Sequence, residues 1–321
     1  MQVTLASELE AVAVEKERKL TDWLGAQASV MLGFSGGVDS AYLACVAVDV
    51  MGPERVLAVI GRSGSYPAAQ WEMARRVAGE FGLSVLEIDT DEMNDPRYAA
   101  NPSNRCYFCK TELWTKLRPV AAERGIAVIV DGTNADDLSD YRPGMQAGRE
   151  HDVRSPLAEL GFTKAEIRLL SRRRGIPTWS QPSSPCLSSR LPHGLAVTPI
   201  RLRQVESAER GLREIGVTGD LRVRHHGDVG RVEIGRDELE QWLTPERAPR
   251  VEKVVLAAGF KRVEIDPHGY GRREAGSGSR EADGGKRDSE GNSESPTPIS
   301  QLAPPASRFP LSASDASLSR D

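Results

Sequence analysis

The chain has 321 residues, a length that suits one large domain or two ordinary ones. Its formal net charge is −4 at pH 7, which argues against a protein whose main partner is a nucleic acid. No apolar run approaches the roughly 18 residues that a membrane span needs, and the acids near the start do not suit a secretory signal. We therefore expect a cytoplasmic protein, in which four cysteines indicate metal binding or catalysis rather than disulfides.

Apolar spacing predicts an N-terminal helix within residues 1–27, and strands then alternate with helices. We expect buried strands in "SVMLGFS", "RVLAVIG", "LSVLEID" and "IAVIVDG", and a helix near residues 163–174. Short apolar strands separated by helices are typical of a doubly wound parallel sheet. Residues 28–197 are therefore predicted to form an α/β domain.

The pattern changes after Thr198. A helix, a hairpin of alternating strands, a second helix and a last strand predict a small α+β domain over residues 198–270. From Gly271 onward the sequence is rich in glycine, serine, proline and charge. We expect the tail of residues 271–321 to be disordered, because it cannot bury enough apolar surface to offset its ordering entropy.

The segment "SGGVDS" directly follows the first expected strand and opens a helix; we call these residues, 35–40, the phosphate loop. Gly36 and Gly37 let the backbone bend tightly and bring N–H groups close to an anion, beside the positive end of the helix dipole. Ser35 and Ser40 offer hydroxyls, and Asp39 is suited to hold Mg²⁺. The lysine of the kinase and GTPase loop is absent, which disfavours transfer of a γ-phosphate.

Two further loops follow strands at the carboxyl edge of the expected sheet, where open α/β sheets bind ligands. The second strand leads into "GRSGSYP", in which Arg62 and Ser63 are candidates for contact with adenine or phosphate. The fourth strand leads into "DGTNADDLSDYRPG", residues 131–144, which we call the aspartate loop. Its Gly132, Asn134 and Asp137 are candidates for the same ATP site. A polar loop and a solvated turn are the alternatives for these two segments.

Three of the four cysteines lie in loop-like segments that are candidates for metal binding or catalysis. Cys106 and Cys109 form a C-x-x-C in a loop expected to lead into a helix near residue 110, and Cys186 lies in a loop rich in proline and serine. The residues alone leave zinc, a redox pair and an iron–sulfur site open, since three thiolates suit a [4Fe–4S] cluster but zinc needs a fourth ligand. Arg190 favours a nucleophilic thiolate at Cys186. Cys45, among alanines and valines, is expected to be a packed interior residue.

The motifs occur in one order, "SGGVDS", "RSGSYP", "NPSNRCYFCK", "DGTNADDLSDYRPG", "RSPLAELGFTKAEIR", "PCLSSRLPHG" and "VRHHGDVGRVEI". Over residues 15–268 the chain resembles the LarE family of ATP-dependent sulfur transferases, which belongs to the N-type ATP pyrophosphatases. The phosphate loop is specific only for that superfamily, whereas the cysteine and aspartate loops are specific for the family. The resemblance implies adenylylation of the carboxylates of pyridinium-3,5-biscarboxylic acid mononucleotide and their conversion to thiocarboxylates, for the nickel-pincer nucleotide of lactate racemase.

The resemblance also implies two sulfur sources. In one form of the family, the cysteine at the position of Cys186 gives up its own sulfur and becomes dehydroalanine. In the other form, three cysteines carry a [4Fe–4S] cluster whose open iron holds a transferable sulfide. Because Cys106, Cys109 and Cys186 are all present, we favour the cluster form, with ATP and Mg²⁺ as the other cofactors. A homo-oligomer, a sulfur donor and the other proteins of pincer-nucleotide synthesis are the implied partners.

The small domain is expected to complete the substrate site. Arg222 and Arg224 alternate along one strand and share a face, and two arginines on one face suit the phosphate of a mononucleotide. Arg190 is predicted to join them. The family binds a divalent metal near carboxylates. The carboxylates at the matching positions are Glu233 on the partner strand and Glu206 or Glu209 on the preceding helix.

Three alternative functions stay open. A tRNA thiolase can combine the same loop with a three-cysteine cluster, but it needs a strongly basic surface and this chain is acidic. A zinc-stabilised nucleotide-binding module would carry out no sulfur chemistry. A synthetase that uses ammonia is disfavoured, because ammonia transfer needs no thiolates in the cysteine loop.

Overall fold

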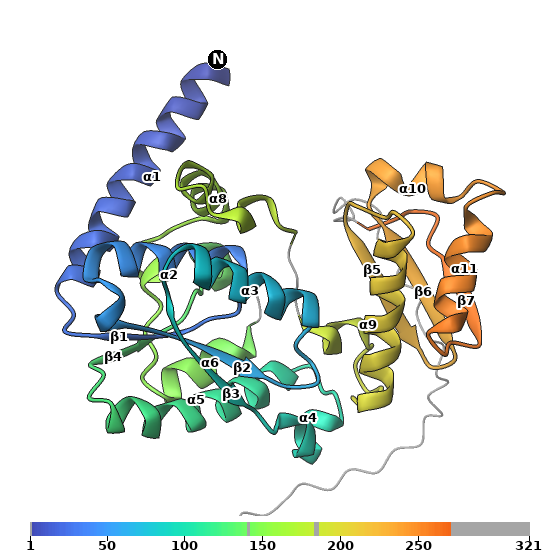
Figure 1. The fold of residues 1–321 in the computed structure, drawn as a ribbon, viewed down its shortest axis with the longest axis horizontal. Coiled ribbons are helices and arrows are strands. Elements are labelled where there is room, and N and C mark those ends of the chain that lie inside the picture. Colours follow the sequence, from blue (N-terminus) through green and yellow to red (C-terminus); the bar gives the residue numbers. More distant parts are fainter. Residues whose placement is uncertain (1, 140–141, 183–185, 271–321) are drawn as a thin grey trace, which may run out of the picture. The chain divides into compact units, whose positions relative to one another are not determined.

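The computed structural model describes residues 2–139, 142–182 and 186–270 (Figure 1). The predicted disordered tail of residues 271–321 lies outside the described residues. Within them, no helix combines the length and the apolar character that crossing a membrane requires.

The first sheet has four parallel strands in the order β3-β2-β1-β4. The strands are β1 (Val30–Gly33), β2 (Val56–Arg62), β3 (Ser84–Asp89) and β4 (Val128–Val130). The register of β1 begins at Val30, which stands opposite Val56 of β2 on one side and Val128 of β4 on the other. Because β1 lies between β2 and β4, the chain winds in both directions from it, and the predicted doubly wound sheet is confirmed.

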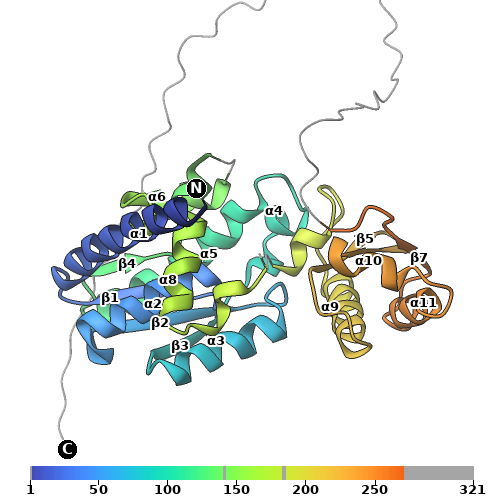
Figure 2. The same ribbon diagram turned by 90° about the horizontal axis from the view of Figure 1, so that it is seen from above.

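Helices cover both faces of this sheet (Figure 1). Alternate residues of β1 divide between the faces, with Leu32 in one buried cluster and Met31 in another. One face carries α1 (Gln2–Gly25), α2 (Val38–Met51), α3 (Ala68–Glu80) and α8 (Lys164–Arg173). Of these, α1, α2 and α8 pack against one another (Figure 2). The other face carries α5 (Arg105–Glu123) and α6 (Pro143–Glu150).

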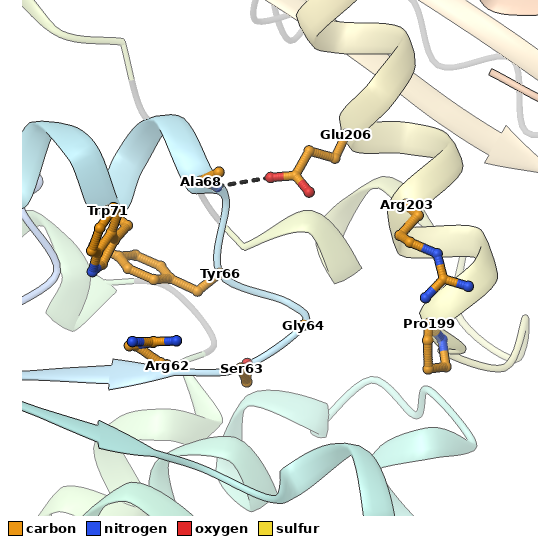
Figure 3. A pocket seen from close by; sticks show the side chains of 9 residues that line it. All are labelled: Arg62, Ser63, Gly64, Tyr66, Ala68, Trp71, Pro199, Arg203 and Glu206. Atoms are coloured by element: carbon orange, nitrogen blue, oxygen red, sulfur yellow. Dashed lines mark hydrogen bonds between the residues drawn. The ribbon is translucent and has the colours of Figure 1, made fainter. Parts of the chain in front are cut away.

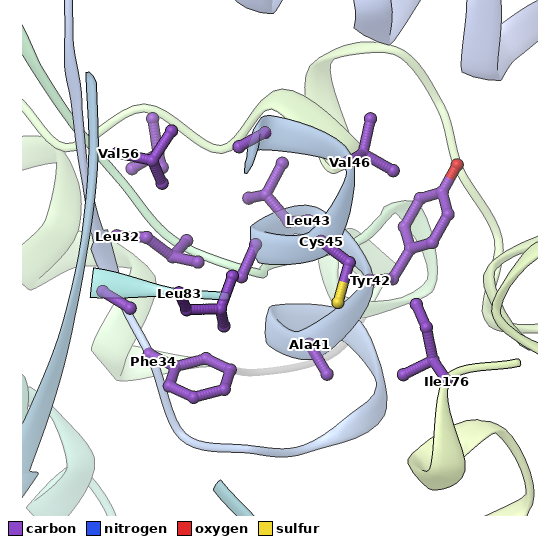
Figure 4. Close-up of a cluster of buried hydrophobic side chains, with 14 of the residues drawn as sticks. Leu32, Phe34, Ala41, Tyr42, Leu43, Cys45, Val46, Val56, Leu83 and Ile176 are labelled. Atoms are coloured by element: carbon purple, nitrogen blue, oxygen red, sulfur yellow. The ribbon is translucent and has the colours of Figure 1, made fainter. Parts of the chain in front are cut away.

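The helix α2 is buried on nearly every side, which explains its unusually apolar sequence (Figure 4). Cys45 is 1 % exposed in this helix and belongs to the core cluster that also holds Tyr42 and Leu43. Burial, with a smaller effect of Asp49, raises the pKa of the Cys45 thiol to about 12. The interpretation of Cys45 as a packed residue is confirmed.

The second sheet has three strands in the order β5-β6-β7. The strands β5 (Leu221–His226) and β6 (Val229–Ile234) form the predicted antiparallel hairpin, and β7 (Arg262–Ile265) runs parallel to β6. Its core is shared with α9 (Pro199–Glu214), α10 (Arg236–Trp242) and α11 (Ala248–Ala257). The short helix α10 is an addition to the predicted elements. The described residues belong to one compact unit, so the domain boundary at 197/198 stays a prediction.

The remaining described elements are short helices: α4 (Pro96–Ala99), α7 (Pro156–Glu159), and the 3₁₀ turns η1 (Pro53–Arg55), η2 (Glu92–Asn94), η3 (Ala135–Ser139), η4 (Pro177–Ser180) and η5 (Leu187–Arg190). One expected boundary was wrong. The cysteine loop does not precede α5: this helix begins at Arg105, directly after Asn104, and takes both Cys106 and Cys109 into its first turns. Asn104 suits the position before a helix, so the local signal was present in the sequence.

Candidate active site

The phosphate loop connects β1 to α2 and is packed tightly against α3. Gly36 has a φ of +66°, and a Cβ atom there would stand 2.6 Å from the Cβ of Ala74. The hydroxyl of Tyr66 and the amide of Gln70 each donate to the carbonyl of Ser35, both at 3.0 Å. Since only glycine tolerates that φ and that close approach, the position of Gly36 is dictated by the turn itself.

The aspartate loop meets the phosphate loop at the start of α2. A Cβ atom on Gly132 would stand 2.8 Å from the backbone nitrogen of Ser40, so the two loops touch along their backbones. Burial raises the pKa of Asp39, with the Asp137 carboxylate adding to the rise, whereas the Lys164 ammonium and the nearby side chain of Asn134 oppose it. The structure therefore brings Asp39, Asn134 and Asp137 close together, and their binding of ATP stays a prediction.

Lys164 is a member of this site that the sequence analysis did not single out. Its Nζ lies 2.5 Å from Oδ2 of Asp39, although the two residues are 125 positions apart in the chain. Lys164 is the first residue of α8, after the cap residue Thr163. The only sequence signal for it was indirect, since the phosphate loop has no lysine and the motif "RSPLAELGFTKAEIR" contains one.

Arg62 and Ser63 lie in a cleft whose lining does not include Asp39. At the end of β2, Arg62 donates to Glu87 of β3 at 3.1 Å. Both residues line a cleft of about 370 Å³ whose walls also include Trp71 of α3 and Arg203 of α9 (Figure 3). Their contact with ATP stays a prediction.

Glu206 of α9 reaches across the same cleft to the start of α3. Its Oε1 accepts a hydrogen bond of 2.7 Å from the backbone N–H of Ala68 (Figure 3). The residue before this helix is Pro67, which offers no side-chain cap. Glu206 therefore serves as the N-terminal cap of α3 in this structure. The sequence had suggested only that Glu206 or Glu209 is a metal ligand.

The three cysteines that were predicted to take part in sulfur transfer lie in two separate segments of the chain. Cys106 and Cys109 lie three residues apart in the first turns of α5, and Cys186 directly precedes η5. Burial raises the pKa of Cys109 strongly, and the Glu92 carboxylate and the Cys186 and Cys106 thiols raise it further. Burial also raises the pKa of Cys186, which Arg105 opposes and Cys106 reinforces. Each thiol thus lies within electrostatic reach of another.

The three predicted phosphate ligands gather next to Cys186. Arg190 is 2 % exposed and donates to the carbonyl of Cys186 at 3.3 Å. Arg224 donates to the carbonyl of Ser189 at 3.2 Å. Arg222 is 7 % exposed; burial, together with the nearby Arg190, lowers its pKa. Arg190, Arg222 and Arg224 thus gather beside residues 186–189, which we call the Cys186 segment, and we call these three arginines the arginine-lined wall. The role of their side chains in phosphate binding stays a prediction.

The predicted carboxylate ligands of a divalent metal face these arginines. Glu209 forms an ion pair with Arg190, in which the closest oxygen lies 2.9 Å from Nε. Glu233 forms one with Arg224 at 3.0 Å. Each carboxylate therefore has a guanidinium partner, and their joint binding of a metal ion stays a prediction.

Comparison with known proteins identifies the family. A family model described as NAD synthase matches residues 17–120. An uncharacterised protein of Synechocystis sp. is 39 % identical over 255 residues, which cover 79 % of this chain and 94 % of the relative. The pyridinium-3,5-bisthiocarboxylic acid mononucleotide synthase of Lactiplantibacillus plantarum is 33 % identical over 241 residues, 75 % of this chain and 86 % of the relative. The chain belongs to the LarE family.

Membership of the LarE family also places the α/β part of the chain among the NAD synthase-like enzymes with a phosphate loop. The NH₃-dependent NAD⁺ synthetase of Methanosarcina acetivorans is 28 % identical over 222 residues, 67 % of this chain and 80 % of the relative. ATP is the nucleotide on which this enzyme superfamily acts, so ATP use by the present LarE protein is supported.

The three cysteines of this LarE protein offer a set of donors for a metal cluster. Three thiols are a suitable donor set for a [4Fe–4S] cluster with one open iron. Within residues 2–139, 142–182 and 186–270, however, no three His, Cys, Asp or Glu side chains stand close enough together to hold a metal ion. The donor type therefore suits a cluster, but the described structure does not bring Cys106, Cys109 and Cys186 together as a metal site, and their joint binding of a cluster stays a prediction.

Proposed function

We propose that the protein is an ATP-dependent sulfur transferase that adenylylates the carboxylates of pyridinium-3,5-biscarboxylic acid mononucleotide and converts them to thiocarboxylates. One observation of the structure supports this proposal in addition to the membership of the family. The Cys186 segment is held from both sides, because Leu187 donates its N–H to the carbonyl of Ser65 at 2.8 Å while Arg190 and Arg224 donate to the carbonyls of Cys186 and Ser189. Cys186, the proposed sulfur residue, thus lies between the loop that follows β2 and the arginines of β5.

The order of the chemistry follows from the weakness of a carboxylate as an electrophile. A carboxylate oxygen attacks the α-phosphorus of ATP, and pyrophosphate leaves as the acyl adenylate forms. A sulfur nucleophile then attacks the carbonyl carbon, and AMP leaves with the bonding electrons. The N–H groups of Gly36 and Gly37 and the start of α2 are suited to hold the departing pyrophosphate. Asp39 would hold Mg²⁺, which offsets the charge of that leaving group.

The sulfur source is the finer part of the proposal. We infer that Cys106, Cys109 and Cys186 hold a [4Fe–4S] cluster, which would supply a sulfide for transfer. Cys186 is then a ligand rather than a sacrificed donor. The three-thiol donor set, with Cys106 and Cys109 one helical turn apart in α5, supports this assignment. A sulfur donor must recharge such a centre after each turnover, and we expect the enzyme to work as a homo-oligomer.

The test is anaerobic purification of the full chain with counts of iron and sulfide and a visible spectrum. We expect iron and sulfide in the wild type, their loss in Cys106→Ala and Cys109→Ala, and their retention in Cys45→Ala, whose thiol lies in the α2 core. ATP–pyrophosphate exchange that depends on the pyridinium substrate tests the adenylylation step separately. If the purified protein contains no iron and Cys186 becomes dehydroalanine after turnover, the cluster is refuted. The proposed sulfur transferase activity would still stand, with Cys186 as the sulfur donor.

A further inference from the structure

The cleft between the end of β2 and α9 is lined by residues outside the sites described above. Its described lining residues include none of the phosphate loop, the aspartate loop or the Cys186 segment. We propose that this cleft is a second nucleotide site, which binds a nucleoside monophosphate with its base on Trp71 and its phosphate on Arg203. The assignment places Arg62 and Ser63 beside this second ligand rather than beside ATP, and it goes beyond the proposed sulfur transfer.

One side of the cleft is an aromatic surface whose orientation is fixed (Figure 3). Glu87 of β3 accepts a hydrogen bond of 3.1 Å from Nε1 of Trp71. The same carboxylate accepts from Arg62 at 3.1 Å and from Arg75 at 2.8 Å, and the Arg75 guanidinium lies 5.9 Å from the centroid of the Trp71 ring. Trp71 and Tyr66 are only partly buried against the core, and both line the cleft. An aromatic face that is already ordered lets a planar base pack on it at little cost in side-chain entropy.

The opposite side of the cleft supplies a cation that has no partner. Arg203 lines the cleft from α9 and is exposed (Figure 3). It forms no hydrogen bond, ion pair or ring contact with any other described residue, whereas Arg62 across the cleft is bound by Glu87. A guanidinium presents its donors in a planar fork that matches a phosphate group. Arg203 is therefore available to bind the phosphate of a ligand whose base lies on Trp71.

The size of the cleft suits a mononucleotide. Glu206 of α9 accepts from the N–H of Ala68, and this hydrogen bond of 2.7 Å ties α9 to the start of α3 at the edge of the cleft. The volume of about 370 Å³ is near the lower end of the range for small-molecule sites, roughly 300–1,000 Å³. One base, one ribose and one phosphate are therefore a better match than a dinucleotide.

Tyr66 is the residue at which the cleft meets the phosphate loop. Its ring lines the cleft, while its hydroxyl donates to the carbonyl of Ser35 at 3.0 Å. The phosphate loop itself contributes nothing to the described lining, so a ligand in the cleft leaves the N–H groups of Gly36 and Gly37 to the proposed ATP site. We therefore expect a nucleoside monophosphate and ATP to bind at the same time.

The experiment titrates AMP into the full chain by calorimetry, with Mg²⁺ and saturating α,β-methylene-ATP present. We expect AMP still to bind the wild type. In Arg203→Met the affinity for AMP should fall about tenfold or more, because a charge-assisted hydrogen bond is lost, and the affinity for adenosine should change by less than about twofold. Trp71→Leu should weaken AMP and adenosine alike, by about fivefold or more, because the base loses its aromatic face. Trp71→Phe keeps such a face and should restore most of the affinity.

Arg201→Met is the matched control. It removes the same charge from α9, but the Arg201 guanidinium donates to the carbonyl of Ala196 at 2.7 Å and does not line the cleft. Its affinity for AMP should stay within about twofold of the wild type. Failure of AMP to bind the analogue-saturated wild type, or an unchanged AMP affinity in Arg203→Met, would overturn the proposal. Wild-type protein that binds AMP but not α,β-methylene-ATP would instead contradict the proposed ATP site, and loss of AMP affinity in Arg203→Met would still support the cleft.

Discussion

Arg190 and Glu209 form a two-point ion pair, in which Nε and Nη2 of the guanidinium lie 2.9 Å and 3.0 Å from the two carboxylate oxygens. The same guanidinium donates to the carbonyl of Cys186 and, at 3.2 Å, to the hydroxyl of Ser189. Arg190 is thereby a positioning residue for the Cys186 segment in this arrangement. Glu209 occupies Nε and Nη2 of Arg190 in this arrangement, and the contact of Arg190 with substrate phosphate stays a prediction.

Arg190→Ala is therefore expected to lower the free energy of unfolding by about 3 kcal/mol or more, because it leaves the Glu209 carboxylate without its partner in a largely buried place. Urea unfolding measures the change. Arg210→Ala is the matched control, since Arg210 pairs with Glu214 on the same helix while both side chains are about 70 % exposed. That variant should change stability by less than about 0.5 kcal/mol. Similar losses in the two variants would contradict the argument.

Arg224→Ala should separate substrate binding from ATP binding. Arg224 is bonded to Glu233 and Ser189 but keeps 35 % of its side chain exposed, so it can reach a ligand at the arginine-lined wall. We expect the affinity for the pyridinium mononucleotide to fall by about tenfold or more, because one charge-assisted hydrogen bond is lost, and the affinity for α,β-methylene-ATP to stay unchanged. Calorimetry with each ligand tests this. A parallel loss of both affinities would indicate a folding defect.

Gly132→Ala should damage the ATP site through the backbone. The new Cβ would stand 2.8 Å from the nitrogen of Ser40 and 3.1 Å from its Cα, and no flexible side-chain end can move aside. We expect nucleotide binding to be lost and the free energy of unfolding to fall by about 1–3 kcal/mol. Gly79→Ala is the control: it lies inside α3 with nothing within 4 Å of its Cβ, so it should be neutral or stabilise by up to about 1 kcal/mol. Normal ATP binding by Gly132→Ala would refute the close approach.

Local signals predicted the sheet and the contact of the two strand-end loops, because parallel strands present their carboxyl ends at one edge. For that reason, the proximity of Asp39 and Asn134 could be expected from the sequence. Lys164 could not, since its approach to Asp39 depends on how α8 packs on α2 rather than on any local pattern. The same holds for Glu209: the sequence offered a carboxylate for a metal, and tertiary packing gave it Arg190 as a partner.

Substitutions of Glu206 can distinguish a role as the N-terminal cap of α3 from a role as a ligand of a divalent metal ion. If it acts as the N-terminal cap of α3, Glu206→Ala should lower the free energy of unfolding by about 1 kcal/mol, and Glu206→Gln by less, because the amide oxygen can still accept from the N–H of Ala68. Urea unfolding measures both changes. The content of divalent metal in the purified protein should be the same in both variants as in the wild type. Loss of metal in Glu206→Ala at unchanged stability would favour the ligand role instead.

The Lys16–Glu166 pair predicts a pH dependence of stability. Burial alone would raise the pKa of Glu166, but the Lys16 ammonium and the N–H and hydroxyl of Thr163 outweigh it and lower the pKa below its ordinary value of 4.5. A group whose pKa is lower in the folded state contributes stability at pH values above its unfolded pKa, and this contribution is lost as the pH falls through the folded pKa.

Urea unfolding of the wild type and Glu166→Gln from pH 7 downward isolates this contribution. The amide can still accept from Thr163 but carries no charge for Lys16, so it imitates the protonated acid. The difference in free energy of unfolding between the two proteins should be constant above about pH 5.5 and shrink as the pH falls below 4.5. A difference that stays flat, or that grows, as acid is added would show that Lys16 does not stabilise the charged form of Glu166.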